Sequence, residues 1–455
     1  MKVINPCNGE LIAEYAPHTP DEIEQRLQLA AEAYGPWRDL PISERARLLA
    51  ELGRCLSLQR TELARLMTLE MGKPIGGALA EIDKCAAACG FFATHGPAFL
   101  EARMVESDAA VSYVRYDPLG PVLAIMPWNF PFWQVIRFLA PALLAGNVAV
   151  LKHAPNVPGC AAAIEAVGAE AGFPPGVLVS VRLDDNAAAE RLIAHPLIRA
   201  VTLTGSERAG IAVAVAAGKV LKKTVLELGG SDPFIVLRDA ELGPTAQAAA
   251  DARCINNGQS CIAAKRFIVE SPVATEFTAR FVAAMRAKTV GNPMERTSDL
   301  GPLARRDLLD NLDDQVRRSI AAGATCLLGG RPIDGPGFFY PPTVLGNVWP
   351  GMAAFDEETF GPVAAIIIAT DVNDAVRLAN SSRFGLGASI WTGDLESARN
   401  TAARIDAGAV FINGIVKSDP RLPFGGIKHS GWGRERATEG IHEFVNVKTV
   451  WVGGK

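Results

Sequence analysis

The segment N-N-G-Q-S-C at positions 256–261 puts a cysteine where nucleophilic chemistry is possible. The approach to Cys261 is polar and contains glycine, and the apolar run Ile262-Ala263-Ala264 follows, which predicts a loop that leads into a buried element. A thiolate at such a junction can attack a carbonyl carbon while backbone N–H groups face the developing oxyanion. We predict that Cys261 is a nucleophile. The alternative is a small buried hydrophobic residue, which is what most of the eight cysteines are expected to be.

Two other polar residues interrupt apolar segments. Glu227 lies in V-L-E-L-G-G, residues 225–230, where burial would raise the pKa of its carboxyl group and suit it to act as a general base toward the thiol or toward water. Asn129 lies in P-W-N-F-P, where two prolines fix a turn and the amide can donate a hydrogen bond to an oxyanion. The plainer alternatives are an N-cap or a buried ion-pair partner for Glu227 and an Asx turn for Asn129.

A fourth segment, L-T-G-S at positions 203–206, closes an apolar run and opens a helical one. Free N–H groups at a helix N-terminus, with Gly205 permitting close approach, form a cradle for phosphate. The segment is not a G-x-G-x-x-G fingerprint, and ordinary helix capping by Ser206 is the competing interpretation.

The elements that must position these residues form an α/β pattern. Short apolar runs alternate with helical stretches, which predicts parallel βαβ units, and the runs lack polar alternation, as expected when helices cover both faces of a sheet. The predicted strands are 121–126, 147–152, 177–181 and 200–204, followed by a second series at 234–237, 266–269, 364–369 and 409–412. The predicted helices between the first strands are 159–171, 187–194 and 209–217.

The remaining segments differ in pattern. Residues 20–90 are helical in character: Asp21 is expected to cap a helix that reaches Ala33, Ser43 to begin a second, and a third at 61–71 to end at Gly72. Near-alternation of apolar and polar residues at 102–117 and 444–452 predicts β-strands, the last of them paired outside its own domain.

Bulk properties exclude several classes of protein. At 455 residues the chain is long enough for two or three domains, and its net charge of −4 gives no electrostatic footprint for nucleic acid or anionic lipid. No apolar stretch reaches membrane-spanning length without breaks. The cysteines form no C-x-x-C pair, so we expect no metal site and no disulfide framework. The N-terminal residues lack a basic segment followed by an apolar one, and we expect a cytoplasmic protein.

Taken in order, these segments resemble the aldehyde dehydrogenase superfamily in its hydrolytic form. The matching motifs are P-W-N-F-P, L-K-H-A, L-T-G-S, L-E-L-G-G, N-N-G-Q-S-C, E-E-T-F-G-P and P-F-G-G-I-K-H-S-G-W-G-R-E, which span residues 127–435. The resemblance implies a Rossmann-like cofactor domain, an α/β catalytic domain and a small β oligomerisation flap. The corresponding ranges are 1–100 with 119–228, then 229–435, and 101–118 with 436–455.

The resemblance also implies roles for individual residues. Cys261 would be the nucleophile, Glu227 the general base, and Asn129 with the Cys261 backbone N–H the oxyanion hole. Glu435 would be a second buried carboxylate near the proton path. The residues that would bind the dinucleotide are Trp128, Lys152, Gly205, Ser206, Glu358 and Phe360.

Within the superfamily the chain is most similar to succinate-semialdehyde dehydrogenases. Arg137, eight residues beyond Asn129, and Ser418 match an arginine and a serine that bind the substrate's distal carboxylate there. A guanidinium and a hydroxyl suit a carboxylate, although Arg137 could instead pair with an acidic side chain. Relatives in one branch carry a second arginine where this chain has Ile255; Arg253 and Lys417 are the residues considered as substitutes. Glutarate semialdehyde and neutral medium-chain aldehydes therefore stay open as substrates.

Cofactor choice is open between NAD and NADP. Relatives that prefer NAD often have an acidic residue three positions after the ribose-binding lysine, and here that position is Pro155, so nothing repels a 2′-phosphate. Position 263 is Ala263 rather than the second cysteine of relatives with a redox switch, so we expect no such switch.

A homodimer or homotetramer is expected. The competing hypotheses are a CoA-acylating enzyme, which Glu227 disfavours, and a catalytically silent structural or binding relative.

Overall fold

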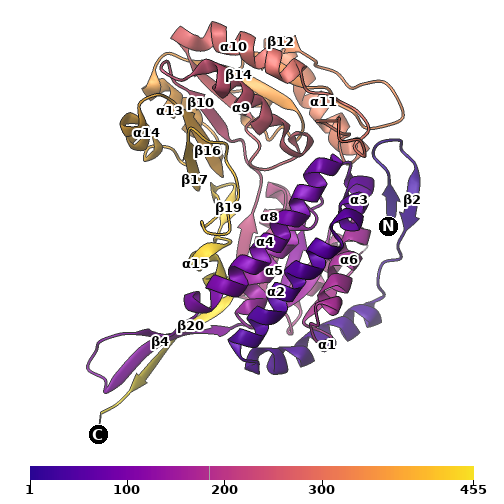
Figure 1. Cartoon of the computed structure of the whole chain (residues 1–455), viewed down its shortest axis with the longest axis vertical. Coiled ribbons are helices and arrows are strands. Elements are labelled where there is room, and N and C mark those ends of the chain that lie inside the picture. The colour runs from indigo at the N-terminus through magenta and orange to yellow at the C-terminus, as the bar shows by residue number, and fades with distance from the viewer. Residues whose placement is uncertain (184, 455) are drawn as a thin grey trace.

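The computed structural model describes residues 1–183 and 185–454, and its larger sheets have six, seven and three strands. Figure 1 shows two α/β bodies, one above the other, with a narrow β-arm that projects from the lower body and carries the C-terminus. The predicted α/β class is confirmed. Two small two-stranded sheets complete the strand pairing: β1 (Lys2–Ile4) with β2 (Leu11–Glu14), and β15 (Phe384–Gly385) with β18 (Ile427–Lys428).

The six-stranded sheet has the order β19-β9-β8-β5-β6-β7, parallel except for β19. The chain builds outward from β5 in one direction through β6 and β7, and then from β8 to β9 in the other. Ligands of open parallel sheets bind at the carboxyl ends of the strands where this order reverses, here between β5 and β8. The strands are β5 (Pro121–Met126), β6 (Val148–His153), β7 (Leu178–Ser180), β8 (Ala200–Thr204), β9 (Lys223–Glu227) and β19 (Gly431–Trp432).

Helices cover this sheet, and each predicted helix begins one or two residues before its predicted start. In the first helix Thr19, not Asp21, is the N-cap. Thr19 and Glu22 form a reciprocal capping box, and Pro20 suits the first helical position because it has no N–H to satisfy. Ser43 likewise does not begin the second helix, which starts one residue earlier. The helices are α1 (Pro20–Asp39), α2 (Ile42–Leu58), α3 (Arg60–Met71), α4 (Ile75–Phe99), α5 (Trp133–Leu144), α6 (Pro158–Glu170), α7 (Asn186–Ala194) and α8 (Glu207–Gly218).

The seven-stranded sheet has the order β12-β13-β14-β11-β10-β16-β17, with only β12 antiparallel to its neighbour. Its strands are β10 (Pro233–Val236), β11 (Arg266–Glu270), β12 (Thr325–Leu328), β13 (Thr343–Gly346), β14 (Val363–Ala369), β16 (Gly387–Trp391) and β17 (Ala409–Ile412). Its helices are α9 (Leu242–Cys254), α10 (Ser271–Arg286), α11 (Arg306–Ala321), α12 (Ala353–Asp356), α13 (Val372–Asn380) and α14 (Leu395–Ala402).

Both faces of this second sheet are buried, which explains the continuous apolar runs in its strands. Phe234 and Val236 pack into one hydrophobic core, whereas Ile235, between them, packs into the core on the opposite face. Strand side chains alternate between faces, so each residue of such a strand must be apolar.

The three-stranded sheet consists of β3 (Arg103–Met104), β4 (Val111–Pro118) and β20 (Val445–Val452), in the order β20-β4-β3. All eight residues of β20 pair with β4, from Val445 opposite Pro118 to Val452 opposite Val111. The predicted strand at 444–452 is therefore confirmed, as is its pairing with the segment 102–117. The turn before it contains α15 (Ala437–Ile441) and the short 3-10 helix η2 (His442–Phe444).

The predicted domain ranges remain a prediction, although the sheets follow them with one difference. Strand β19 lies within the range 229–435 but pairs with β9 of the six-stranded sheet, so the chain returns to that sheet near its end. Across the part of the chain that the structure describes, none of the helices combines the length and apolar character that crossing a membrane requires.

Candidate active site

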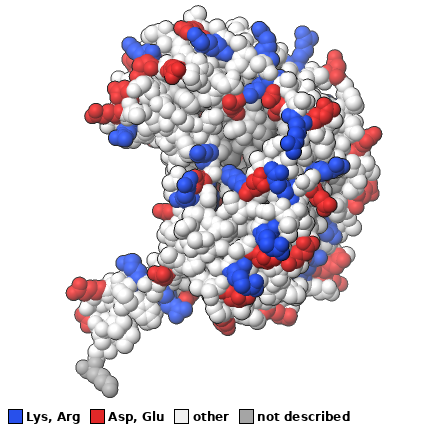
Figure 2. Space-filling model, in the orientation of Figure 1, with Lys and Arg blue, Asp and Glu red and all other residues white. Residues whose placement is uncertain are grey.

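A cavity of about 490 Å³ opens at the carboxyl ends of β5 and β8. Figure 2 shows the surface hollowed between the two α/β bodies, with acidic and basic side chains interspersed over the face drawn. Seven residues singled out from the sequence line this one cavity: Trp128, Asn129, Gly205, Ser206, Cys261, Glu358 and Phe360. The cavity also has lining residues that the sequence did not single out, namely Gln134, Arg208, Arg305, Leu308 and Asn311.

The loop that carries Cys261 is tightly constrained. It begins with the 3-10 turn η1 (Ile255–Gly258), where Asn256, Asn257 and Gly258 all have left-handed backbone angles. The Asn257 side chain donates to the carbonyl oxygens of Gly72 and Pro302 and accepts from the N–H of Gly301. These contacts hold the loop in a strained conformation, which is common at active sites.

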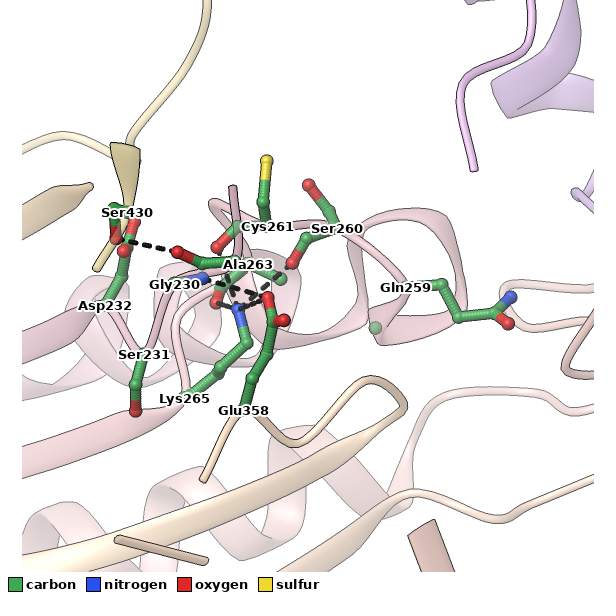
Figure 3. Close-up of polar contacts among 12 residues, drawn as sticks. Gly230, Ser231, Asp232, Gln259, Ser260, Cys261, Ala263, Lys265, Glu358 and Ser430 are labelled. Atoms are coloured by element: carbon green, nitrogen blue, oxygen red, sulfur yellow. Dashed lines mark hydrogen bonds and ion pairs between the residues drawn. The ribbon is translucent and has the colours of Figure 1, made fainter. Parts of the chain in front are cut away.

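Lys265 fastens the other side of the loop. Its buried ammonium donates to the carbonyl oxygens of Ser260, Cys261 and Ala263, at 3.1, 2.8 and 3.0 Å, and lies 3.9 Å from Glu358 Oε1. Figure 3 shows this cluster on one side of the loop, with the Cys261 sulfur pointing away from it. The sequence analysis missed Lys265; a lone lysine at the start of a buried strand was the signal available.

The pKa of the Cys261 thiol is raised to about 12, chiefly by burial. The positive charges of Arg137 and Lys265 lower the pKa, whereas Glu358 and Glu227 raise it further. At neutral pH the thiol therefore holds its proton, and thiolate must be generated during the reaction.

Asn129 is held against the cysteine loop rather than in an Asx turn. Its amide nitrogen donates to the Gln259 carbonyl at 3.1 Å, and Asn256 donates to the Asn129 carbonyl at 2.7 Å. His153, at the end of β6, contacts the Pro131 carbonyl at 2.9 Å, and burial lowers its pKa to about 4, so the ring is neutral. The amide of Asn129 is thus fixed beside Cys261.

Glu227 ends β9 and is buried, with only 2% of its surface exposed. One of its carboxylate oxygens has no hydrogen-bond partner within the described residues. Burial and the nearby Glu435 raise the pKa of Glu227 well above its ordinary value, against the opposing effect of Arg137 and two other arginines. Glu227 does not line the nucleotide-side cavity, but it lies close enough to Cys261 to raise the thiol's pKa.

Arg137 is engaged within the protein. Its guanidinium forms a buried ion pair with Glu435 and donates to Thr204 Oγ1 at 3.0 Å. The sequence analysis had kept open an acidic partner for this arginine, and Glu435 is that partner. Ser418 lies elsewhere in contact with Lys84, whose ammonium donates to its hydroxyl oxygen at 2.7 Å.

Neither residue considered as a substitute for a second arginine lines the cavity. Arg253 is fully buried and donates to the Gly258 carbonyl at 2.6 Å, so it supports the cysteine loop. Lys417 is exposed to solvent.

The residues predicted to bind the dinucleotide come from both α/β bodies. Ser206 caps α8 by accepting from the N–H of Ala209, and it also lines the cavity, so capping is observed and binding of pyrophosphate stays a prediction. The rings of Trp128 and Phe360 meet edge to face at 5.7 Å. Lys152, near the end of β6, is half-buried, and burial lowers its pKa.

Comparison with known proteins decides the family. The model of the aldehyde dehydrogenase family matches residues 1–450. The chain belongs to the aldehyde dehydrogenase family. It is 51% identical to a probable NADP-dependent succinate-semialdehyde dehydrogenase of Synechocystis, with 99% of each chain covered. It is 52% identical to the NAD(P)-dependent succinate semialdehyde dehydrogenase Sad of Escherichia coli, with 98% of this chain and 97% of the other covered.

Solved structures agree. The succinic semialdehyde dehydrogenase of Streptococcus pyogenes, solved with NADP⁺, superposes with a TM-score of 0.97 at 35% identity, with both chains fully covered. The predicted aldehyde dehydrogenase fold is therefore confirmed. No group of His, Cys, Asp and Glu suited to a metal ion occurs within residues 1–183 and 185–454.

Proposed function

We propose that this aldehyde dehydrogenase oxidises succinate semialdehyde to succinate, with NADP or NAD as the electron acceptor. The observation that carries the proposal is the meeting of the Cys261 thiol and the Asn129 amide in one cavity, at the strand ends where open sheets bind nucleotides. The succinate-semialdehyde dehydrogenases of Synechocystis and Escherichia coli support the substrate.

Carbon–sulfur bond formation is the first step. The Cys261 sulfur adds to the aldehyde carbon, its proton leaves to a base, and the carbonyl oxygen becomes negatively charged. The Asn129 amide and the Cys261 backbone N–H are the proposed donors to that oxygen. Lys265 holds the Ser260 carbonyl, which shares one planar peptide with the Cys261 N–H, so the orientation of this N–H is already fixed.

The cavity residues fit a dinucleotide. The N-terminus of α8 at Ser206 suits the pyrophosphate, and no carboxylate in the described chain pairs with Lys152, which leaves it for the adenosine ribose. When bound, the nicotinamide supplies the two-electron acceptor that converts the hemithioacetal to a thioester. Glu358 is proposed to bind the nicotinamide ribose, and Phe360, packed on Trp128, to position the ring.

Acid release requires a base beside the thioester. Glu227 in its ionised form takes a proton from water, and the resulting hydroxide attacks the thioester carbon and expels the Cys261 sulfur. Glu435, whose negative charge raises the pKa of Glu227 and which is paired with Arg137, is the proposed next group on the proton path. Free succinate and the thiol are the products of this step.

We propose that the enzyme accepts both cofactors because no negative charge stands at position 155. Pro155 stands where an acidic side chain would repel a 2′-phosphate, so NADP is accepted as well as NAD. The relatives support this breadth, since the Synechocystis protein is named for NADP and the Escherichia coli protein for both.

The assembly is proposed to be a homodimer or homotetramer, held through the flap of residues 101–118 and 436–455. The ranges 1–100 with 119–228, and 229–435, are the proposed cofactor and catalytic domains. A reducing compartment, the cytoplasm, is proposed because all eight cysteines are free thiols.

A panel of substrates and cofactors tests the proposal. Initial rates are measured with succinate semialdehyde, glutarate semialdehyde and hexanal, each with NAD and NADP, on the parent and on Cys261→Ala. We expect the highest kcat/KM with succinate semialdehyde and no dinucleotide reduction by Cys261→Ala. A parental rate in that variant overturns the thioester mechanism, and acid formed only when CoA is added assigns the chain to an acylating enzyme instead.

A further inference from the structure

A second cavity, of about 410 Å³, shares no lining residue with the cavity that contains Cys261. It is lined by Phe130, Ile255 and Asn256, and Asn256 also donates to the Asn129 carbonyl, so the cavity adjoins Asn129. The cavity facing Ser206 and Glu358 is the proposed nucleotide site. The aldehyde therefore has the second cavity as its separate approach.

Two cations on the wall of this cavity, Lys84 and Arg296, have no ion-pair partner within residues 1–183 and 185–454, and only Lys84 is partly buried, because Arg296 is exposed to solvent. Lys84, on α4, lines the cavity, and within residues 1–183 and 185–454 no carboxylate lies at ion-pairing distance from it. The nearest acid on the same helix, Glu81, is already paired with Lys73 and accepts from the N–H groups of Phe132 and Trp133. A partly buried ammonium without an anion is costly, which points to an anionic ligand.

The contacts of Lys84 leave donors free toward the cavity. Its ammonium donates to Ser418 Oγ at 2.7 Å and lies 4.1 Å from the centroid of the Trp133 ring. An ammonium has three donors, and only one of them is used on Ser418. Because Ser418 accepts this bond, its own hydroxyl proton remains available to a second acceptor.

Two arginines add positive potential behind Lys84 but are themselves committed. Arg137 is paired with Glu435, and Arg436 donates to the Asp419 carbonyl, while both guanidiniums lie over the Phe424 ring. Burial, Arg436 and Arg137, in that order, lower the pKa of Lys84 to about 8, against smaller opposing effects of Cys85 and Glu81. Arg137 also lowers the pKa of Cys261, so its positive charge acts on both the cysteine and the lysine.

We propose that Lys84, together with the Ser418 hydroxyl, binds the distal carboxylate of the semialdehyde directly, and that Arg137 acts on the substrate only through its positive charge. This inference rests on the proposed function, because it requires a substrate with an aldehyde at one end and a carboxylate at the other. Lys84 thereby supplies the cation that Ile255 does not.

Lys84→Met is the test variant, since methionine keeps the packing on Trp133 and removes the charge. We expect KM for succinate semialdehyde to rise roughly 10- to 100-fold, the loss of one charge-assisted hydrogen bond, while kcat and all constants for hexanal change less than about twofold. The inhibition constant of succinate should rise in parallel, and Lys84→Arg should restore most of the affinity.

Lys288→Met is the matched control. Lys288 lines the same cavity but is neutralised by Asp251 at 2.6 Å, so its loss should leave KM for the semialdehyde nearly unchanged. An equal rise in KM for Lys288→Met would show a general effect of cavity charge and overturn the assignment to Lys84.

The parent enzyme gives a test that needs no variant. Binding of the carboxylate requires the protonated ammonium, so KM for succinate semialdehyde should increase as the pH rises through about 8, while KM for hexanal should not. The Lys84→Arg variant should show this increase only at higher pH. If the parent prefers the semialdehyde to hexanal and Lys84→Met retains that preference, Lys84 does not bind the carboxylate. If the parent itself shows no such preference, the proposed substrate is wrong.

Discussion

At the residue scale, the proposed chemistry depends on the protons of the partly exposed Cys261 and the buried Glu227. Desolvation raises the pKa of both groups, and the negative charge of Glu227 raises the pKa of the Cys261 thiol further. The sequence analysis described the attacking group as a thiolate, whereas burial favours the neutral thiol. In the proposed mechanism, nucleophilic attack therefore depends on Arg137 and Lys265, whose charges favour the thiolate as it forms.

Glu227→Gln separates the two steps in which a base is needed. If Glu227 activates water, the variant should still form one equivalent of reduced dinucleotide per site in a rapid burst. Steady-state turnover should fall by about 10²- to 10⁴-fold because the thioester is not hydrolysed. Stopped-flow absorbance measures the burst, and mass spectrometry detects the acylated chain. Loss of the burst itself would instead make Glu227 the base that removes the thiol proton.

The same carboxyl group makes stability depend on pH. Its pKa is higher in the folded chain than in the unfolded chain, so folding binds a proton, and the contribution to stability is lost as the pH rises from the unfolded pKa of about 4.3 toward the raised value. Glu227→Gln mimics the protonated form permanently. Its Tm relative to the parent should increase between pH 5 and pH 8 in scanning calorimetry, whereas exposed Glu62→Gln should show no such trend. A difference in Tm that does not change with pH would mean that ionisation of Glu227 does not destabilise the folded chain.

At the scale of elements, the cysteine loop and the segment after Phe360 are packed too closely to change independently. Gly258 has a φ of +73°, and a Cβ there would lie 2.2 Å from the Gly361 carbonyl carbon and 2.6 Å from the Pro362 nitrogen. We expect Gly258→Ala to displace the segment that carries Glu358 and to lower kcat/KM by about 10²-fold, the usual cost of a displacement of about 1 Å. Gly90→Ala, which meets nothing within 4 Å, is the control.

An element can be predicted from the sequence when the interactions that form it are between residues close together in the chain. Strand β17 at Ala409–Ile412 was predicted to the residue, because its apolar run is a local signal. The start of α1 was misassigned by choosing Asp21, since Thr19 and Asp21 are both good capping residues and only the geometry of the capping box separates them. The contact between Lys84 and Ser418 joins residues 334 apart, and no local pattern carries such a pairing.

The site residues divide in the same way. Asn129 and Ser206 follow the carboxyl ends of β5 and β8, and parallel sheets bring such ends together, so their shared cavity could be anticipated. Cys261 joins them from the loop before β11 of the other sheet, which strand order alone does not predict. Lys265 and Lys84 were missed because each looks like an ordinary residue of a strand or helix until the tertiary structure removes it from solvent. Burial of a lone charge is a property of packing and not of spacing.

At the scale of the whole molecule, the projecting arm of β4 and β20 exposes an apolar edge strand that can pair with another chain. Strand β20 is an edge of its three-stranded sheet, and its Val447 and Trp451 are 60% and 55% exposed. A long edge strand with exposed apolar side chains is a template for pairing with another chain, and a second copy of this protein is the proposed partner.

Charge on this arm should therefore reduce the assembly. We expect the double variant Val447→Asp and Trp451→Glu to shift the mass measured by light scattering from that of a dimer or tetramer to that of the monomer. The active-site cavity is built from the two α/β bodies and not from the arm, so the burst of dinucleotide reduction per chain should persist in the monomer. Exposed Leu58→Glu on α2, a comparable change away from the arm, controls for surface charge. An unchanged mass for the double variant would mean that the arm does not hold the copies together, and simultaneous loss of the burst would mean that the site depends on the neighbouring copy.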